Sequence, residues 1–110
     1  MVQWIKSHAH YADFKQPNFQ LRTAHFYIPV LVCAGETAVG ITISKKIGNA
    51  VRRNLLKRRI KAWIYQNHTL FTSGYQLNLV AKRGAAELSW LDLCAQLSIL
   101  CSLLHKRDMA

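Results

Sequence analysis

The stretch from Val39 to Lys61 reads V-G-I-T-I-S-K-K-I-G-N-A-V-R-R-N-L-L-K-R-R-I-K and joins two kinds of secondary structure. Its first residues alternate between apolar and small or polar side chains, which is typical of a strand. Gly48-Asn49 then makes a turn, and Asn49 is a suitable N-cap for a helix that begins directly after it. The stretch therefore predicts a strand followed by a helix rich in Lys and Arg.

Positive charge is concentrated in this stretch and is not balanced nearby. The stretch holds eight of the chain's 15 Lys and Arg residues, and no Asp or Glu lies between Glu36 and Glu87. Charges this dense repel one another unless a polyanion neutralises them. The formal net charge of the whole chain is +10. Nucleic acid bound through its phosphates is the favoured partner, and an anionic membrane surface is the competing one.

The bulk properties of the chain indicate a globular protein. Its 110 residues are expected to form a single domain, residues 1–110, and a hydrophobic content of 51% is enough for a core. No apolar run approaches the roughly 20 residues that a membrane-spanning helix needs. The segment Met1–Ala12 also lacks the apolar region of a signal peptide. We therefore expect a cytoplasmic protein with no membrane partner.

Residues typical of a catalytic or metal centre are few and dispersed. Cys33, Cys94 and Cys101 lack C-x-x-C spacing, which disfavours a zinc site and a disulfide framework. The five acidic residues do not form the carboxylate cluster that a two-metal nuclease needs. We expect no catalytic side chain and no metal ion or other cofactor held by this chain alone.

The apolar patterns predict an α+β fold in which helices pack on a small mixed sheet. The expected order is helix, three strands, helix, strand, helix (αβββαβα). The elements are expected over residues 7–15, 19–23, 25–33, 38–44, 49–67, 75–81 and 89–106. Strand 38–44 is expected to run antiparallel to strand 25–33. Pro29 has no N–H to donate, which predicts an edge position or a bulge for it.

The helix expected over residues 49–67 separates its side chains into an apolar and a cationic face. Leu56, Ile60 and Trp63 form the apolar stripe, which can pack on the sheet. Cations repeat along the other side at a pitch of about 6 Å, which suits phosphates along a nucleic-acid strand. The predicted RNA-binding residues are Lys45, Lys46, Asn49, Arg52, Arg53, Asn54, Lys57, Arg58 and Lys61. The alternatives are a solvated charged face and a membrane-surface helix, and the latter would expose the stripe that the core needs.

These residues resemble the protein subunit of bacterial ribonuclease P. In that family a strand ends in S-K-K and is followed by G-N-A-V-x-R-N-R-x-K-R. The matching segments here are Ser44-Lys45-Lys46, Gly48-Asn49-Ala50-Val51, Arg53-Asn54 and Lys57-Arg58. V-A-K-R-G-A-A-E-L-S, residues 80–89, is similar to the family's final strand and its turn into the last helix. The likeness covers about Val39 to Leu104 and is more specific than a basic patch alone.

The resemblance implies both a fold and an activity. The family's αβββαβα fold contains a left-handed strand-helix-strand crossover, against the usual right-handed rule. Ribonuclease P removes the 5′ leader of precursor tRNA by endonucleolytic cleavage, and its catalytic component is an RNA that works with Mg²⁺. The protein is an accessory subunit. Its implied partners are the catalytic RNA, bound through the basic helix, and precursor tRNA, whose leader lies in a cleft between the sheet and the first helix.

The chain departs from the family pattern at two basic positions. Leu55 stands where the family usually has an arginine, and Lys61 where it often has one, so the planar guanidinium fork is missing at both. The resemblance also places Phe14 in the leader cleft, with Phe26 and Tyr27 as further candidates for stacking on single-stranded bases. Plain core packing is the alternative for these three aromatics.

We therefore predict a protein component of ribonuclease P that binds the catalytic RNA and the leader of precursor tRNA. The alternative is a general RNA-binding or ribosome-associated module with no role in cleavage. No protein partner is predicted.

Overall fold

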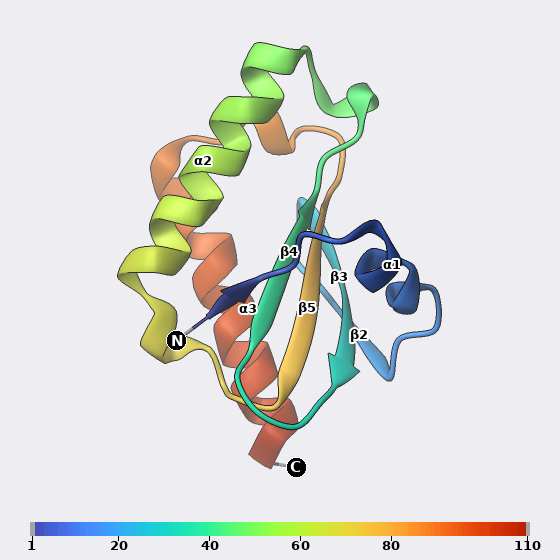
Figure 1. The fold of residues 1–110 in the computed structure, drawn as a ribbon. Coiled ribbons are helices and arrows are strands. Elements are labelled where there is room, and N and C mark those ends of the chain that lie inside the picture. Colours follow the sequence, from blue (N-terminus) through green and yellow to red (C-terminus); the bar gives the residue numbers. More distant parts are fainter. Residues whose placement is uncertain (1, 110) are drawn as a thin grey trace.

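The computed structural model describes residues 2–109, which form a five-stranded sheet and three α-helices. In chain order these are β1 (Gln3–Trp4), α1 (His8–Ala12), β2 (Phe19–Arg22), β3 (Phe26–Val32), β4 (Ala38–Thr42), α2 (Ala50–Gln66), β5 (Tyr75–Ala81) and α3 (Trp90–Met109). Short 3-10 turns cover Asp13–Lys15, Lys45–Ile47, His68–Leu70 and Ala85–Glu87. In Figure 1, α2 and α3 lie on one side of the sheet and α1 on the other. None of the helices within residues 2–109 is both long and apolar enough to span a membrane.

Local sequence signals place the second half of the chain correctly. α2 begins after Asn49, whose Oδ1 accepts the N–H of Arg52 at 2.9 Å. α3 begins after Ser89, whose Oγ accepts the N–H of Asp92 at 3.1 Å. Both side chains satisfy a backbone donor that the first turn of a helix leaves unpaired. β5 spans the predicted residues 75–81.

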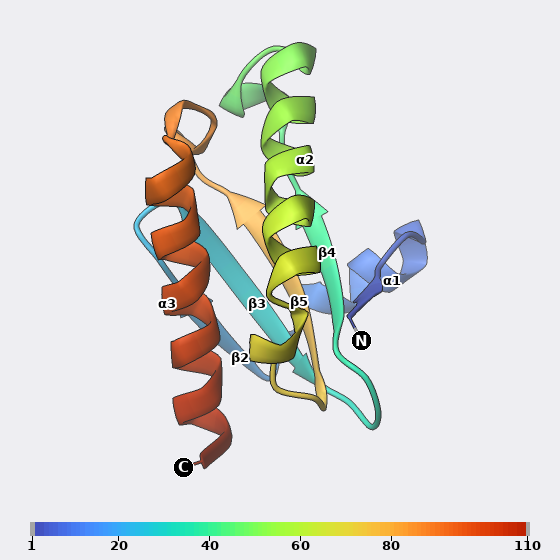
Figure 2. The ribbon, with the colours of Figure 1, turned by 90° about the vertical axis from the view of Figure 1, so that its left-hand side faces the viewer.

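The strand order is β1-β4-β5-β3-β2. β5 pairs in parallel with β4 and antiparallel with β3, so it separates two strands that are consecutive in the chain. β4 therefore runs antiparallel to β3, as predicted, without pairing with it. The connection from β4 through α2 to β5 is left-handed (Figure 2), as the resemblance implies and against the usual preference.

β1 is a strand that the sequence analysis does not predict. Gln3 and Trp4 pair in parallel with Ala38 and Val39 of β4. The N–H of Gln3 donates to the carbonyl oxygen of Thr37 at 2.8 Å, and the N–H of Ile5 to that of Val39 at 2.9 Å. These bonds attach the N-terminal segment to the edge of the sheet next to α2.

The prediction that Pro29 lies at a sheet edge or in a bulge is wrong. β3 is an interior strand between β5 and β2, and Pro29 pairs with Gln20 of β2. The ladder to β5 skips Ile28 and Pro29 and resumes in the same register on either side. The backbone groups of His25 and Cys33 form hydrogen bonds on the β5 side of β3. Backbone groups of every second residue in a strand point to the same side, so an N–H at position 29 would also face β5, and proline lacks it. The interior strand accommodates proline by giving up a ladder hydrogen bond rather than by bulging.

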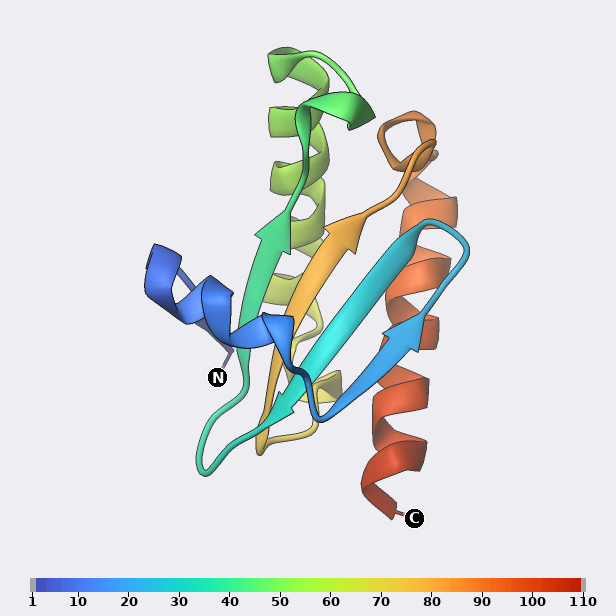
Figure 3. The same ribbon diagram turned by 90° about the vertical axis from the view of Figure 1, so that its right-hand side faces the viewer.

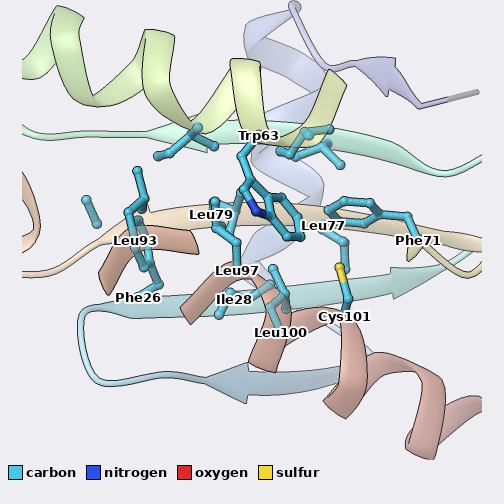
Figure 4. Packing of buried hydrophobic residues seen from close by; sticks show 14 of the residues in the cluster. Phe26, Ile28, Trp63, Phe71, Leu77, Leu79, Leu93, Leu97, Leu100 and Cys101 are labelled. Atoms are coloured by element: carbon cyan, nitrogen blue, oxygen red, sulfur yellow. The ribbon is translucent and has the colours of Figure 1, made fainter. Parts of the chain in front are cut away.

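The main core lies between the sheet and helices α2 and α3 (Figure 4). The predicted stripe of α2, Leu56, Ile60 and Trp63, points into it with no side chain more than 4% exposed. The predicted stripe of α3 is buried as well: Leu93, Leu97, Leu100 and Leu104. Each large apolar side chain buried in this way contributes about 1.5–3 kcal/mol. The buried stripe of α2 fixes its rotation, so that its cations face away from the core.

α1 lies on the opposite face of the sheet from α2 and α3 (Figure 3). A smaller apolar cluster attaches it there. Ile5, Phe14 and Ala38 are its buried members, and Tyr11 and Leu31 pack against them. The N-cap of α1 is Ser7, whose Oγ accepts the N–H of His10 at 3.0 Å. The cluster holds the N-terminal segment and α1 beside β4.

Gly40 in β4 leaves the space that the Tyr11 ring occupies. A Cβ added at Gly40 would lie 2.6 Å from Cε1 of Tyr11. The Tyr11 hydroxyl donates to the carbonyl oxygen of Ile5 at 3.2 Å and accepts the N–H of Ile41 at 3.1 Å. β1 pairs only with Ala38 and Val39 of β4, and the Tyr11 ring covers the part of β4 that follows them.

Candidate nucleic-acid interface

A groove of about 850 Å³ runs between the N-terminal segment, the sheet and α2. Its N-terminal wall is formed by Trp4, Ile5, Lys6, His8 and Tyr11. The sheet and the residues that follow β4 contribute Val39, Ile41, Thr42, Ile43 and Asn78, and α2 contributes Lys57 and Lys61. No Asp or Glu is among these lining residues, and three of them are Lys. The groove therefore combines an apolar surface with uncompensated positive charge.

Lys57 and Lys61 reach the groove because of their positions relative to the buried stripe of α2. They follow Arg53 at i+4 and i+8, so the three cations form one row along the side of the helix that adjoins β4. Both lysines are exposed. The predicted row of cations is therefore brought against the sheet edge rather than directed away from the protein.

A second hollow, of about 210 Å³, continues this row toward the start of α2. It is lined by Ile41, Ile43, Arg53, Asn54 and Lys57. Arg53 is half-buried there, and its Nε is a buried side-chain nitrogen that lacks a hydrogen-bond partner within residues 2–109. Asn54 adds an amide that can both donate and accept. Lys57 lines both hollows, so they form one continuous cationic surface.

Trp4 and Lys61 meet at the other end of the groove. The Lys61 Nζ lies 5.2 Å from the centre of the Trp4 ring, which is cation–π distance. The backbone hydrogen bonds on either side of Trp4 hold it in β1. The aromatic ring therefore fixes the position of a cation at the rim of the groove.

The arginines on the opposite flank of α2 contact other parts of the protein. The Arg52 Nη1 lies 3.2 Å from the Glu87 carboxylate, in a pair whose side chains are both more than half exposed. The Arg59 Nη1 donates to the carbonyl oxygen of Leu88 at 3.5 Å. An exposed ion pair contributes about 0–1 kcal/mol, so Arg52 stays available to an anionic ligand. Arg52 and Arg59 do not line the groove.

The remaining predicted RNA-binding residues lie around the start of α2 and on its outer side. Lys45 and Lys46 are exposed in the 3-10 turn that follows β4. Asn49 is exposed, but its Oδ1 is used as the helix cap. Arg58 points outward from α2, and Leu55 is 37% exposed. The groove and its extension thus collect Arg53, Asn54, Lys57 and Lys61, and the other predicted residues lie outside them.

The three aromatic residues predicted for the leader cleft have different surroundings. Phe26 is 1% exposed in the main core, on the face of the sheet that α2 and α3 cover, so its ring cannot stack on a base there. Phe14 is 7% exposed beneath α1, with its ring stacked 6.4 Å from that of His10. Tyr27, the next residue along β3, points to the opposite face from Phe26. It is half-buried, and the Arg22 guanidinium lies 5.3 Å from its ring centre.

Sequence reasoning misses most of the N-terminal wall of the groove, in particular Trp4, Lys6 and Tyr11. Their signal is weak because β1 has two residues, too few for a periodic pattern. The adjacent Trp4-Ile5-Lys6 resembles many irregular segments. The pairing of β1 with β4 and the two hydrogen bonds of the Tyr11 hydroxyl show that these side chains share a groove with α2.

The side chains with shifted pKa values lie outside the groove. Burial raises the pKa of the Cys101 thiol to about 12. The Tyr75 hydroxyl donates to the Asp108 carboxylate at 2.8 Å, and this bond raises the pKa of Tyr75. These shifts belong to the packing of α3 on the sheet.

Fold and site together define a small α+β nucleic-acid-binding protein, with a left-handed crossover and a cationic groove free of acidic residues. The family follows from sequence comparison. A profile of the Ribonuclease P family matches residues 3–105, so the chain belongs to the ribonuclease P protein family. This confirms the resemblance stated above.

Relatives and solved structures agree with this assignment. The Ribonuclease P protein component of Geobacter sp. (strain M21) is 37% identical over 98 residues, covering 88% of this chain and 84% of that protein. That of Syntrophobacter fumaroxidans is 37% identical over 100 residues, covering 87% and 81%. The RNase P protein of Staphylococcus aureus superposes with a TM-score of 0.78 at 23% identity, covering 91% and 93%. The Thermotoga maritima RNase P protein has a TM-score of 0.76 at 20% identity, covering 86% and 89%.

Membership in the family establishes the general role of the chain. It is a protein component of ribonuclease P, a tRNA-processing endoribonuclease, and partners with an RNA subunit in a ribonucleoprotein. The solved structures confirm the predicted α+β fold.

Proposed function

We propose that this chain acts as one RNA-binding domain, in which α2 binds the catalytic RNA subunit and the groove holds the 5′ leader of precursor tRNA. The observation that carries this proposal is the acid-free groove of about 850 Å³ beside the cationic row of α2. The ribonucleoprotein would then remove the leader by endonucleolytic cleavage in the cytoplasm.

The groove suits a single RNA strand because it offers two kinds of contact side by side. Lys57 and Lys61 can neutralise phosphates along the strand. The apolar wall and floor can contact sugars and unstacked bases, as in other single-strand binding sites. Phe14 packs with Ile5 and Tyr11 and so supports the N-terminal wall of the groove. Tyr27 does not line the groove but lies on the face of β3 that α1 shares, where it is a candidate for stacking on a base of the leader outside the groove.

The cleavage chemistry is assigned to the RNA subunit. Within residues 2–109 there is no group of three or more His, Cys, Asp or Glu side chains that could hold a metal ion. The side chains within that range therefore lack the ligand cluster that a magnesium site would need. Their contribution is to bind and position RNA, while Mg²⁺ would act in the assembled RNA–protein complex.

Reconstitution tests the proposal directly. The purified chain is mixed with its cognate ribonuclease P RNA at low Mg²⁺, and leader removal from a precursor tRNA is followed. We expect the chain to stimulate cleavage by the RNA and to cleave nothing alone. RNA binding without stimulation would favour a general RNA-binding module, and cleavage by the chain alone would refute the division of labour.

A charge-matched pair of variants tests the groove. Lys57→Ala removes a cation that lines both hollows, whereas Lys106→Ala removes an exposed cation from the last turn of α3. We expect Lys57→Ala to weaken precursor-tRNA binding and to reduce the slope of log K against log salt by about 0.7–0.9 per lost phosphate contact. Lys106→Ala should retain the wild-type slope. Equal effects of the two substitutions would mean that charge in general, rather than the groove, binds the leader.

A further inference from the structure

A shallower hollow, here called the outer hollow, adjoins the groove on the outer side of α2. It measures about 370 Å³ and is lined by Trp4, Arg58, Lys61, Ala62, Tyr65 and Gln66. Trp4 and Lys61 also line the groove, so the two hollows meet at these side chains. As in the groove, no acidic residue lines the outer hollow.

The wall between the two hollows is held in place. β1 holds Trp4 by pairing with β4, and the Lys61 Nζ lies 5.2 Å from the ring centre of Trp4. A strand of RNA that leaves the groove past Lys61 would reach the outer hollow without crossing a negatively charged side chain.

Tyr65 is the residue of the outer hollow that the fold leaves unexplained. It is 76% exposed in the last turn of α2, and the buried side chains of that helix are Leu56, Ile60, Trp63 and Ile64. Arg58 and Tyr65 are seven residues apart and share one face of α2, on which Lys61 lies beside both. An exposed aromatic ring flanked by two cations is the arrangement by which proteins stack a single-stranded base and neutralise its phosphates.

We propose that the outer hollow is a second subsite for an unpaired leader nucleotide, with Tyr65 stacking on the base and Arg58 and Lys61 contacting the flanking phosphates. This inference rests on the proposed function, because it takes the strand in the groove to be the leader. It adds a specific ligand, the first nucleotide to pass Lys61, and a specific platform, the Tyr65 ring.

The test uses the assembled ribonucleoprotein and precursor tRNAs whose leaders are lengthened one nucleotide at a time. Affinity of the wild type should rise by a further fivefold to tenfold at the length that reaches the outer hollow, since base–aromatic stacking has effects of this size. Tyr65→Ala should lack this rise, and Tyr65→Phe, which keeps the ring, should retain it. Leu91→Ala, which truncates a 78% exposed side chain on α3, is the matched control and should behave as wild type.

Two results overturn the inference while leaving the proposed function intact. In the first, Tyr65→Ala shows the full wild-type rise with leader length. In the second, it weakens binding equally at every length, including tRNA without a leader, which would mean that the ring contacts another part of the RNA. A wild type whose affinity ignores leader length altogether would overturn both the outer hollow and the leader groove.

Discussion

Gly40→Ala tests how α1 and the wall of the groove are attached to the sheet. The φ angle of Gly40 is not positive, so its backbone conformation does not require glycine. Alanine at a strand position would otherwise be favoured by about 0.5–1 kcal/mol. The added Cβ would lie 2.6 Å from Cε1 and 2.8 Å from the hydroxyl oxygen of Tyr11, so the ring must move.

The cost follows from the contacts that Tyr11 would lose. Its hydroxyl bonds to the carbonyl oxygen of Ile5 and the N–H of Ile41, at 3.2 and 3.1 Å. Losing two such bonds costs about 1–3 kcal/mol in total. After the intrinsic preference for alanine is subtracted, we expect the free energy of unfolding to fall by about 1.3 kcal/mol, the midpoint of a range of about 0–2.5 kcal/mol. The midpoint corresponds to a decrease in Tm of roughly 5–10 °C for a domain of this size.

A double-mutant cycle separates the clash from other effects. Gly40→Ala, Tyr11→Ala and the double variant are unfolded in urea, and hydrogen exchange at the Ile41 amide reports the local contact. Without the Tyr11 ring, Gly40→Ala should be neutral or stabilising, because the three atoms nearest to the new Cβ all belong to the Tyr11 side chain. If Gly40→Ala is equally destabilising in both backgrounds, the ring is not what requires glycine and the reasoning is refuted.

Three further predictions concern the elements that support the interface. Asn49→Ala should lower the free energy of unfolding in urea by about 1 kcal/mol because α2 loses its N-cap, whereas Asn49→Asp should retain the wild-type value. Gln96→Ala should lower the free energy of unfolding by about 1–3 kcal/mol, because the buried Gln96 Oε1 accepts the N–H of His25 and the hydroxyl of Thr23, both at 2.9 Å. A loss below about 0.5 kcal/mol, which is the scale of ordinary surface substitutions, would contradict this prediction. Burial raises the pKa of Cys101 to about 12, so the thiol of the unfolded chain ionises at a lower pH than the thiol of the folded chain. The free energy of unfolding should therefore keep its full contribution from Cys101 below about pH 9 and lose it progressively as the pH rises toward 12. Urea unfolding across that range should therefore show a steeper loss of stability in the wild type than in Cys101→Ala, and parallel curves would rule this out.

Elements with a repeating local pattern are predictable from the sequence alone. The leucine stripe of α3, the alternation in β5 and the polar cap of α2 each repeat or terminate within a few residues. Periodicity of 3.6 or 2 then decides which side chains are buried. The cationic row of α2 follows in the same way, because burying Leu56 and Ile60 leaves Arg53 and Lys57 at the side of the helix.

Strand order and the environment of Pro29 are not predictable in this way. β5 inserts between β3 and β4, and a proline is tolerated in an interior strand, because long-range packing of the whole sheet outweighs one ladder hydrogen bond. The left-handed crossover likewise has no signature in the periodicity of the chain, and only family resemblance predicts it.

The sequence by itself determined, through charge and periodicity alone, that this protein has a basic helix and which face of that helix is buried. It also predicted phosphate as the ligand of the cationic face. Only the tertiary structure decided that the helix borders a groove, that Trp4 and Tyr11 form its far wall, and that Phe26 belongs to the core while Tyr27 does not. The physical reason is range. Propensity, capping and amphipathicity act over a few residues. The groove is made by segments 29 or more residues apart, such as Tyr11 and Gly40 or Trp4 and Lys61, which meet because the sheet brings them together.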